Sequence, residues 1–477
     1  MNFNFKRQLL PFFVLLGLNV FLSPQIFAQR PVDKQNPTNP SQLLSDYLKI
    51  KSIKGNEGEA GRFLSKYCMD KGLHVKVFSE KDSMYNFSAS LYPLNSKKPN
   101  IVFINHIDVI PAGDSAVWKY PPFSGAIINN EIWGRGAIDC KGLAVMQLAA
   151  IISFIDSAKY NNLPYNITFL SVSGEETNSA NGAGYITENF LTELNPSVVF
   201  GEGGSGIINA VSSNPEKIIF GISLSEKSSL LIKLEVHSES FGHSAAPSDL
   251  YANKKLIKAL IKLMEAKRYL VFDKLLLSMF KKLGKMEGGI KGFVVSHINW
   301  GIFWPFVKNK FNEGEPLNTL VYNTFAITNI SNPKSAYNQI ADKAEAIIDC
   351  RLLPGTDSAK FLRKLKNTLG PKVKITVLSK SPDALPSKQD KFFDIFSLCL
   401  KNNYKNSEVL PILFPATTDN NYFRNKNIDV YGIIPAVFSL EAMQSVHNTN
   451  ERISIDNLNK GTEVFKEFIS KVNLSKK

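Results

Sequence analysis

Two adjacent glutamates, Glu175 and Glu176, stand where an apolar run ends and a loop of small residues begins. In an extended chain, neighbouring side chains point in opposite directions, so the two carboxylates would not share one task. Burying both of them is costly unless cations compensate for the lost hydration. A divalent metal supplies that compensation, with one glutamate as ligand and the other as general base. The alternative is a pair of solvated acids on a surface loop.

Further candidate ligands follow predicted strands or flank predicted helices. His106 and Asp108 are two residues apart in an extended segment and share a face, so Asp108 can accept a hydrogen bond from the His106 ring nitrogen that does not bind metal. Asp139 precedes a predicted helix, where capping is its alternative role. Glu202 lies between glycines that allow close backbone approach, and His447 lies in a loop before the last predicted helix.

Taken together, these side chains suit a centre with two metal ions. The two imidazoles and three carboxylates are His106, Asp139, Glu176, Glu202 and His447. If Asp139 bridges, each metal receives one histidine and one further carboxylate, which suits a co-catalytic zinc pair. Proteins with open α/β sheets bind their substrates and cofactors outside the carboxyl ends of the strands, and most of these five residues fall there. Taken alone, each is also compatible with a packed histidine or a surface acid.

The predicted elements indicate an α/β fold. Apolar strands at 101–108, 166–173 and 197–204 alternate with helices, one of which begins near Leu143. Strands that are apolar on both faces predict a mostly parallel sheet with helices on both faces.

An α+β unit interrupts this pattern. From about residue 226 the order becomes β-α-β-β-α-β, which is typical of a ferredoxin-like unit. We therefore expect a catalytic domain formed by residues 41–225 and 381–477, with an inserted lid or dimerisation domain at 226–380. Within the insertion, residues 268–316 form an extra aromatic stretch. It is expected to pack against the core or lid, and the alternatives are a lipophilic substrate wall or a surface that docks on lipid.

The N-terminus predicts export. Lys6 and Arg7 precede an apolar run and a small-residue stretch that ends at Ala28. This pattern predicts a signal peptide at residues 1–28, cleaved after Ala28, and a polar, proline-rich linker at 29–40. The apolar run is shorter than the roughly 20 residues that span a bilayer, which disfavours an uncleaved anchor. We expect a periplasmic or extracellular protein.

Charge and cysteine content narrow the classes of partner. The formal net charge of +14 is spread along the chain without an arginine-rich patch. It suits a solvated lysine-rich surface and favours anionic partners, whereas export argues against nucleic acid. The four cysteines show no metal-binding or CxxC spacing and are expected to be buried thiols, although an oxidising compartment permits a disulfide; they are Cys68, Cys140, Cys350 and Cys399.

Six motifs in order resemble the M20 family of dizinc metallopeptidases: HID, GRGAIDCKG, SGEE, FGEGG, FGHSAAP and SVHNTNE. The match extends from about residue 40 to the C-terminus, and the GEGG region is similar to the branch of carboxypeptidase S and the N-fatty-acyl-amino-acid hydrolases. The resemblance implies two Zn²⁺ per subunit, with Co²⁺ or Mn²⁺ as substitutes. His106 and Glu202 would hold one zinc, Glu176 and His447 the other, and Asp139 would bridge. Glu175 would be the general base and Asp108 the residue that orients His106.

The resemblance also assigns roles to the inserted domain. His243 matches the lid histidine that hydrogen-bonds the oxyanion, often in a partner subunit's site, so a homodimer is expected. Asn338 and Arg351 match residues that bind substrate, and the planar guanidinium of Arg351 suits a free carboxylate. The segment TTDNNYF at 417–423 matches a loop beside the active site.

The sequence departs from the family pattern at three positions. Ala341 replaces a usual proline, and Gly201 stands where the similar branch has aspartate. Cys140 follows the bridging residue, at a position where the family often has an acid or methionine. The first departure weakens the assignment of Asn338, and the second leaves Glu202 as the ligand candidate in its motif.

The expected function is an exported zinc hydrolase that cleaves the amide bond of a small peptide or N-acyl amino acid with a free carboxylate. An N-fatty-acyl-amino-acid hydrolase or aminoacylase is the first alternative, and an inactive relative acting as a binding protein is the second. Membrane contact is allowed but not required. The sequence leaves the native metal, the oligomeric state and the length of the acyl group open.

Overall fold

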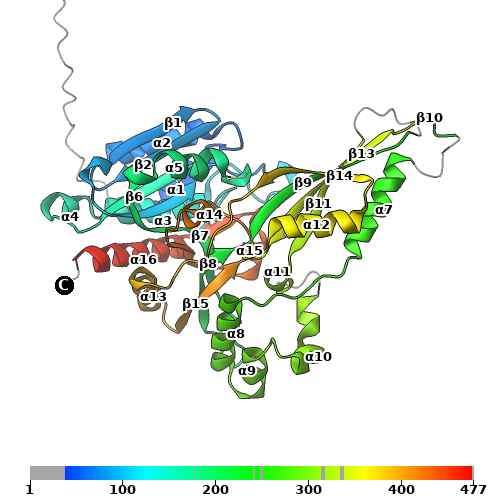
Figure 1. The fold of residues 1–477 in the computed structure, drawn as a ribbon. Coiled ribbons are helices and arrows are strands. Elements are labelled where there is room, and N and C mark those ends of the chain that lie inside the picture. Colours follow the sequence, from blue (N-terminus) through cyan, green and yellow to red (C-terminus); the bar gives the residue numbers. More distant parts are fainter. Residues whose placement is uncertain are drawn as a thin grey trace, which may run out of the picture.

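The computed structural model describes residues 38–177, 179–239, 242–245, 247, 251–312, 317–332 and 338–474 (Figure 1). The predicted signal peptide lies outside the described residues. Helix α1 (Pro40–Lys49) begins at the last residue of the predicted linker, because the Asn39 side chain accepts hydrogen bonds from the backbone N–H groups of Ser41 and Gln42. No helix in the described part of the chain combines the length and apolar character needed to cross a bilayer.

An eight-stranded sheet forms the centre of the molecule, in the order β1-β2-β6-β3-β7-β16-β8-β15. Its strands are β1 (His74–Lys81), β2 (Met84–Ser90), β3 (Asn100–His106), β6 (Asn166–Val172), β7 (Pro196–Ile207), β8 (Ile218–Glu226), β15 (Ser407–Phe414) and β16 (Val430–Val437). The run from β6 through β3 and β7 to β16 is parallel, as is the β8–β15 pair. The predicted mostly parallel sheet is confirmed, with an antiparallel β1–β2 hairpin added at one edge.

Helices cover both faces of this sheet, as predicted. Ile101 and Phe103 of β3 point into one core cluster, whereas Val102 and Ile104 point into the other. The first face carries α1, α2 (Glu57–Asp70), α3 (Lys141–Ile152), α13 (Lys391–Asn403) and α16 (Ile455–Leu474), and the second carries α5 (Tyr185–Asn189) and α14 (Asn420–Asn425). Every residue of β3 is buried, so its carboxyl end is held rigidly at the site.

A second sheet of four antiparallel strands, in the order β11-β13-β9-β14, forms the inserted unit, for which we keep the name lid from the sequence analysis (Figure 1). In chain order its elements are β9 (Ser228–His237), α7 (Ala252–Met264), β11 (Thr324–Ser331), β13 (Lys343–Leu352), α12 (Ser358–Leu369) and β14 (Val373–Lys380). This is the predicted β-α-β-β-α-β unit. Burial alternates along β13, so one face packs on the helices while Arg351 and Asp349 lie on the open face.

The extra aromatic stretch packs against the large sheet. It forms α8 (Lys274–Glu287), α9 (Gly289–Ser296), α10 (Trp304–Val307) and, after residue 316, α11 (Asn318–Val321). Leu276 and Phe280 of α8 share a core cluster with Ile219 of β8 and Leu410 of β15. The inner face of this stretch therefore extends the core of the catalytic sheet.

Short elements complete the fold. The smaller pairings join β4 (Ala126–Ile128), β5 (Glu131–Trp133) and β17 (Arg452–Ser454), and separately β10 (Gly242–His243) and β12 (Gln339–Ile340). The remaining helices are α4 (Ile155–Tyr160), α6 (Leu191–Leu194) and α15 (Leu440–Gln444). All four cysteines are buried free thiols, as the sequence predicts.

Candidate active site

The predicted metal ligands converge at the carboxyl edge of the large sheet. His106 ends β3, the turn that carries Glu176 follows β6, and Glu202 lies in β7, the neighbour of β3. Asp139 precedes α3, and His447 follows α15. Because β3, β6 and β7 are parallel, their carboxyl ends meet at one edge, where open α/β sheets bind ligands.

The ligand atoms form a continuous chain of contacts. His106 Nε2 lies 3.0 Å from Asp139 Oδ1 and 3.6 Å from Glu202 Oε2. His447 Nε2 lies 3.1 Å from the other Asp139 oxygen, Oδ2, and 3.2 Å from Glu176 Oε1. Asp139 thus presents one carboxylate oxygen to each imidazole, which is the arrangement required of a bridging ligand.

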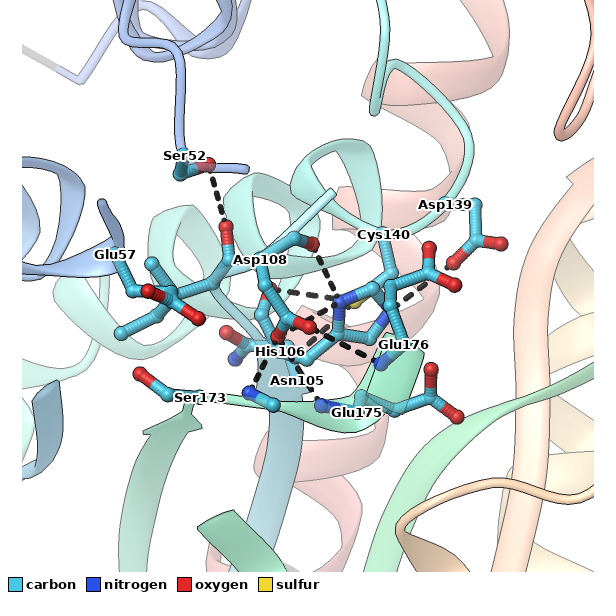
Figure 2. A network of polar contacts seen from close by, with 12 residues as sticks. Ser52, Glu57, Asn105, His106, Asp108, Asp139, Cys140, Ser173, Glu175 and Glu176 are labelled. Atoms are coloured by element: carbon cyan, nitrogen blue, oxygen red, sulfur yellow. Dashed lines mark hydrogen bonds and ion pairs between the residues drawn. The ribbon is translucent and has the colours of Figure 1, made fainter. Parts of the chain in front are cut away.

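The backbone carbonyl of Asp108 orients the His106 ring. His106 Nδ1 lies 2.8 Å from this oxygen and 3.8 Å from the Asp108 carboxylate, so the predicted acceptor atom is wrong although the residue is the expected one. The carboxylate instead accepts the backbone N–H groups of Gly174, Glu175 and Glu176, at 2.8, 3.2 and 3.0 Å. Figure 2 shows Asp108 between the His106 ring and this turn. Asp108 therefore links the ligand histidine to both glutamates.

Glu175 and Glu176 lie in a turn, not in an extended chain. Residues Glu175–Thr177 form a 3₁₀ turn, so the predicted strand-like alternation of the pair is wrong. The turn forms because the Asp108 carboxylate holds its backbone N–H groups, and it still separates the two side chains (Figure 2). Glu176 points toward Asp139 and contacts His447, whereas Glu175 extends away from that contact.

Asp139 does not cap the following helix. The N-cap of α3 is Cys140, and no side chain makes a capping hydrogen bond there. Glu451 fixes the Asp139 loop: its Oε1 accepts the backbone N–H groups of Ile138 and Asp139 at 2.9 and 3.1 Å. Its Oε2 accepts Gly136 N–H and the Arg135 guanidinium at 2.9 and 2.7 Å. The predicted alternative of a helix cap is therefore wrong, because the carboxylate is turned to the histidines.

Glu202 lies inside β7, whereas the sequence placed it at a strand end. The pairing of β3 with β7 stops at Phe103 and Phe200, but β7 continues to Ile207 alongside β16 and β8. Glycines make this continuation possible: a Cβ on Gly203 would lie 2.7 Å from the backbone of Gly432. At Gly201, where the similar branch has aspartate, a Cβ would lie 2.2 Å from Asn420 Oδ1.

Crowded negative charge characterises the site. Burial, followed by the charge of Asp139, raises the pKa of Glu202 to about 8. Burial and the charge of Glu202 raise the pKa of Glu175 well above its ordinary value. Hydrogen bonds to Asp139 and Glu176 raise the pKa of His447 to about 10. The backbone of His447 has a φ of +59°, a region rarely adopted outside glycine, and this conformation accompanies its two carboxylate contacts.

The Cys140 thiol packs beneath His106. Its Sγ accepts the backbone N–H of His106 at 3.2 Å, and burial raises the pKa of the thiol to about 12. Cys140, His106 and Glu202 nevertheless place ligand-type atoms within 4.8 Å of one another, as do His106, Asp139 and Glu176.

Arg351 lies at the end of β13 that approaches the catalytic sheet. Its Nε and Nη2 both contact Asp349 Oδ2, at 3.2 and 2.9 Å. It pairs across the sheet with Thr324, whose hydroxyl accepts a hydrogen bond from Lys227. The backbone carbonyl of Lys227 accepts a hydrogen bond from Thr417, at the start of the TTDNNYF loop.

His243 and Asn338 lie together at the other end of the lid. Strands β10 and β12 pair, and Ser244 N–H donates to the backbone carbonyl of Asn338 at 3.1 Å. Both side chains are exposed, and Figure 1 shows β10 at the outer tip of the lid, away from β7 and α14. The structure therefore does not bring His243 or Asn338 to the metal ligands of the same chain.

Sequence reasoning missed two acids at this site. Glu451 holds the Asp139 loop, and it closes the SVHNTNE motif that drew attention to His447. Asp419 is buried in the TTDNNYF loop; burial raises its pKa to about 7, and its charge acts on both Glu175 and Glu202. Each acid belongs to a motif that the sequence analysis names, but the residues that each acid acts on are distant in sequence, so the motif alone did not reveal its role.

Comparison with known proteins identifies the family. Residues 102–471 match the model of peptidase family M20/M25/M40, so the chain belongs to this family of hydrolases. A probable carboxypeptidase S-like protein 2 of Dictyostelium discoideum is 27% identical over 392 residues, which cover 81% of this chain and 73% of that protein. The N-fatty-acyl-amino acid synthase/hydrolase PM20D1 of Mus musculus is 27% identical over 398 residues, covering 81% and 77%.

A solved structure supports the fold. An M20 family metallo-carboxypeptidase from Sulfolobus solfataricus superimposes with a TM-score of 0.68 at 22% identity, covering 91% of this chain and 99% of that one.

The site chemistry fits the metal dependence of M20 metallopeptidases, which usually use zinc. Imidazole and carboxylate are ligands that zinc prefers, and the side chains that supply them contact one another here. Burial raises the pKa of both Glu175 and Glu202, and a bound cation would offset the cost of burying their charged forms.

Proposed function

We propose that this protein is an exported dizinc hydrolase that cleaves the amide bond of a small peptide or N-acyl amino acid with a free carboxylate. The observation that carries the proposal is the His106–Asp139–His447 bridge beside the turn that bears Glu175 and Glu176. His106 and Glu202 would hold one zinc, His447 and Glu176 the other, and Asp139 both. When bound, zinc would polarise the substrate carbonyl and lower the pKa of water.

Glu175 is suited to move the proton. It lies next to a ligand glutamate, and Asp108 fixes the backbone of the turn that holds both residues. As general base, its carboxylate would accept a proton from water and pass it to the leaving amine.

Arg351 is suited to bind the substrate carboxylate. Asp349 contacts its Nε and Nη2, which orients the guanidinium and leaves further N–H groups for a ligand. A planar donor binds a carboxylate with two hydrogen bonds, a geometry that lysine does not reproduce. The strand pairing of Arg351 with Thr324 connects the backbone at this position, through Lys227, to the TTDNNYF loop.

A homodimer would allow His243 to act as the oxyanion donor. Arg351 and Lys343 are eight residues apart on β13, roughly 25 Å in an extended strand, and His243 lies beyond Lys343. One small substrate would therefore not contact both residues of one lid. Within the described part of the chain β11 is a terminal strand of its sheet, and α7 exposes Ile257 and Ile261, which supplies a surface for a second copy.

A substrate panel tests the reaction. Zinc-loaded protein is assayed on dipeptides, N-acetyl amino acids and long-chain N-acyl amino acids, each with a free and an amidated carboxylate. The names of the two relatives support this range of substrates. We expect hydrolysis of at least one free-acid class, loss of activity with a chelator, and loss of roughly tenfold or more in kcat/KM for Arg351→Lys.

Two results would overturn the proposal. Zinc-loaded protein that hydrolyses no member of the panel would favour a binding protein, and equal rates on amidated and free acids would remove the carboxylate role of Arg351. Export is tested separately by sequencing the N-terminus of protein recovered outside the cytoplasm, which we expect to begin at Gln29.

A further inference from the structure

The outer face of α9 and α10 exposes a group of large apolar side chains. We call residues 289–311 the cap; in Figure 1 it lies below β15, at the end of the molecule opposite β1. The exposed fractions are 87% for Ile290, 51% for Phe293, 48% for Trp300, 72% for Ile302 and 80% for Phe306. Single exposed apolar residues are ordinary, but five within one short segment mark an interaction surface.

Other side chains attach the cap to the large sheet. Ile298 and Phe311 are buried with α8 in the core cluster shared with the large sheet. On the outer face, the rings of Phe293, Trp300 and Phe303 contact one another, with ring centroids 6.0 to 6.1 Å apart. The cap thus has a buried apolar face and a second, preformed apolar face that remains exposed.

Exposed lysines lie within the cap and in the adjacent helix α8. Residues 288–312 contain no Asp or Glu and include Lys291, Lys308 and Lys310, all of which are exposed. The adjacent helix α8 adds further exposed lysines, Lys281, Lys282 and Lys285. Its one acid, Glu287, is already engaged by Lys291 at 3.0 Å and by the backbone N–H of Ser212.

We propose that the cap docks the protein on the surface of an anionic membrane. Tryptophan and phenylalanine favour the headgroup boundary, aliphatic side chains enter the acyl region, and lysines attract anionic lipid. A second copy fits less well, because a self-complementary interface would bring these lysines against each other. Nucleic acid also fits less well, because Ile290, Ile302 and Phe306 are more exposed than Trp300 and isoleucine gives no stacking surface for bases. This inference does not depend on the proposed substrate.

Vesicle flotation tests the docking. The chain from Gln29, which includes every described residue, is mixed with vesicles of phosphatidylcholine alone or with about 30% phosphatidylglycerol. We expect binding to the anionic vesicles and a blue shift of tryptophan fluorescence. Ile302→Ser/Phe306→Ser should weaken this binding at least roughly tenfold, and Lys308→Gln/Lys310→Gln roughly tenfold.

Matched variants control for composition and folding. Met69→Ser/Leu385→Ser removes two exposed apolar side chains outside the cap, and Lys372→Gln/Lys405→Gln removes two exposed lysines outside it. Both should bind like the wild type, and all variants should keep the wild-type melting temperature.

Three results would overturn the proposal: no binding to anionic vesicles, equal binding by the cap variants, or equal losses in the matched controls. Concentration-dependent self-association that only the Ile302→Ser/Phe306→Ser variant loses, without lipid binding, would assign the face to a second copy instead. Because hydrolysis of water-soluble substrates is measured without vesicles, failure here leaves the proposed function standing.

Discussion

The catalytic sheet and the lid differ in how they hold their candidate functional residues. In the sheet, β3 is buried along its whole length, and the residues after β3 and β6 are tied to one another through Asp108. In the lid, β13 is buried on alternate residues only, so Arg351 and Asp349 lie on an open face. His243 is exposed at the far tip. The sheet thus holds its candidate ligands in place without substrate, whereas under the proposed function the candidate groups of the lid would have to be brought to them.

This difference separates two kinds of contribution to catalysis. Metal ligands must be held within a fraction of an ångström, and rigid elements achieve this best. Groups that bind the substrate or the oxyanion act only once the substrate is enclosed, so they can come from a moving domain or another subunit. The following predictions test whether the two regions divide the work in this way.

The largest effect is expected within the sheet, at the glutamate pair. Glu175→Gln should lose roughly 10²-fold or more in turnover and keep its metal, because it removes a proton carrier and no ligand. Glu176→Gln should lose metal as well as activity. Metal analysis of the dialysed proteins, alongside initial rates, makes the measurement. Equal metal loss in both variants would show that Glu175 and Glu176 do not have these separate roles.

A second strong effect is expected at Glu451, which touches no predicted ligand side chain. Its two oxygens accept four hydrogen bonds. Glutamine would replace one of these acceptor oxygens with an amide N–H₂ group, which cannot accept a hydrogen bond from the N–H groups that face it. Glu451→Gln should weaken metal affinity roughly 10- to 100-fold through the Asp139 loop, and breaking the buried pair with Arg135 should cost about 3–5 kcal/mol of stability.

The matched control for Glu451 is Glu463→Gln, which breaks an exposed contact with Lys466 and should change little. Metal titration and urea unfolding report the two effects separately. A Glu451→Gln protein with unchanged metal affinity would show that the sheet holds Asp139 without it.

A moderate effect tests whether the lid acts across subunits. His243→Ala and Glu175→Gln should each be inactive alone. After subunit exchange, half of the dimers are mixed and each mixed dimer has one intact site, so activity should recover to roughly a quarter of the wild type. Proven exchange without recovery would mean that His243 acts within its own chain or not at all.

The last effect concerns stability and not catalysis, at Lys227, which lies at the junction of the two regions between β8 and β9. Its ammonium donates to Tyr322 O and Thr324 Oγ1, and burial, followed by the nearby positive charge of Arg351, lowers the pKa of Lys227 to about 7. In the unfolded chain the pKa returns to about 10.4. Between these values the unfolded state binds one more proton than the folded state, so stability contributed by this group rises with pH.

We therefore expect the wild type to gain stability relative to Lys227→Met as the pH is raised from about 7 to 10. Urea unfolding midpoints measured across this range for both proteins give the comparison. Parallel curves would show that Lys227 stays charged in the folded state and that the junction is more open than its burial indicates.

Local patterns predicted the main strands and helices and the candidate metal ligands, but not the roles of Glu451 and Asp419. Apolar runs at 101–108 and 166–173 predict strands because strands covered on both faces need apolar side chains throughout. The order β-α-β-β-α-β after residue 226 predicts the lid for a similar reason, since helix and strand periods are readable within single segments. The ligand-type residues of the site were all visible as chemistry-bearing side chains in short motifs.

Tertiary structure alone decided which atom of each residue does what. The sequence shows Asp108 near His106, but only the packed site shows that its carbonyl holds the ring and its carboxylate holds the turn of Glu175 and Glu176. It shows Asp139 before a helix, but only the packed site shows that Glu451, about 300 residues away in the chain, accepts the backbone N–H of Asp139 and that the Asp139 carboxylate faces both histidines. It shows His243 in a family motif, but the length of β13 separates it from Arg351. The hydrogen bonds at the site and the distance between His243 and Arg351 depend on how distant segments pack, and a local sequence pattern does not contain this information.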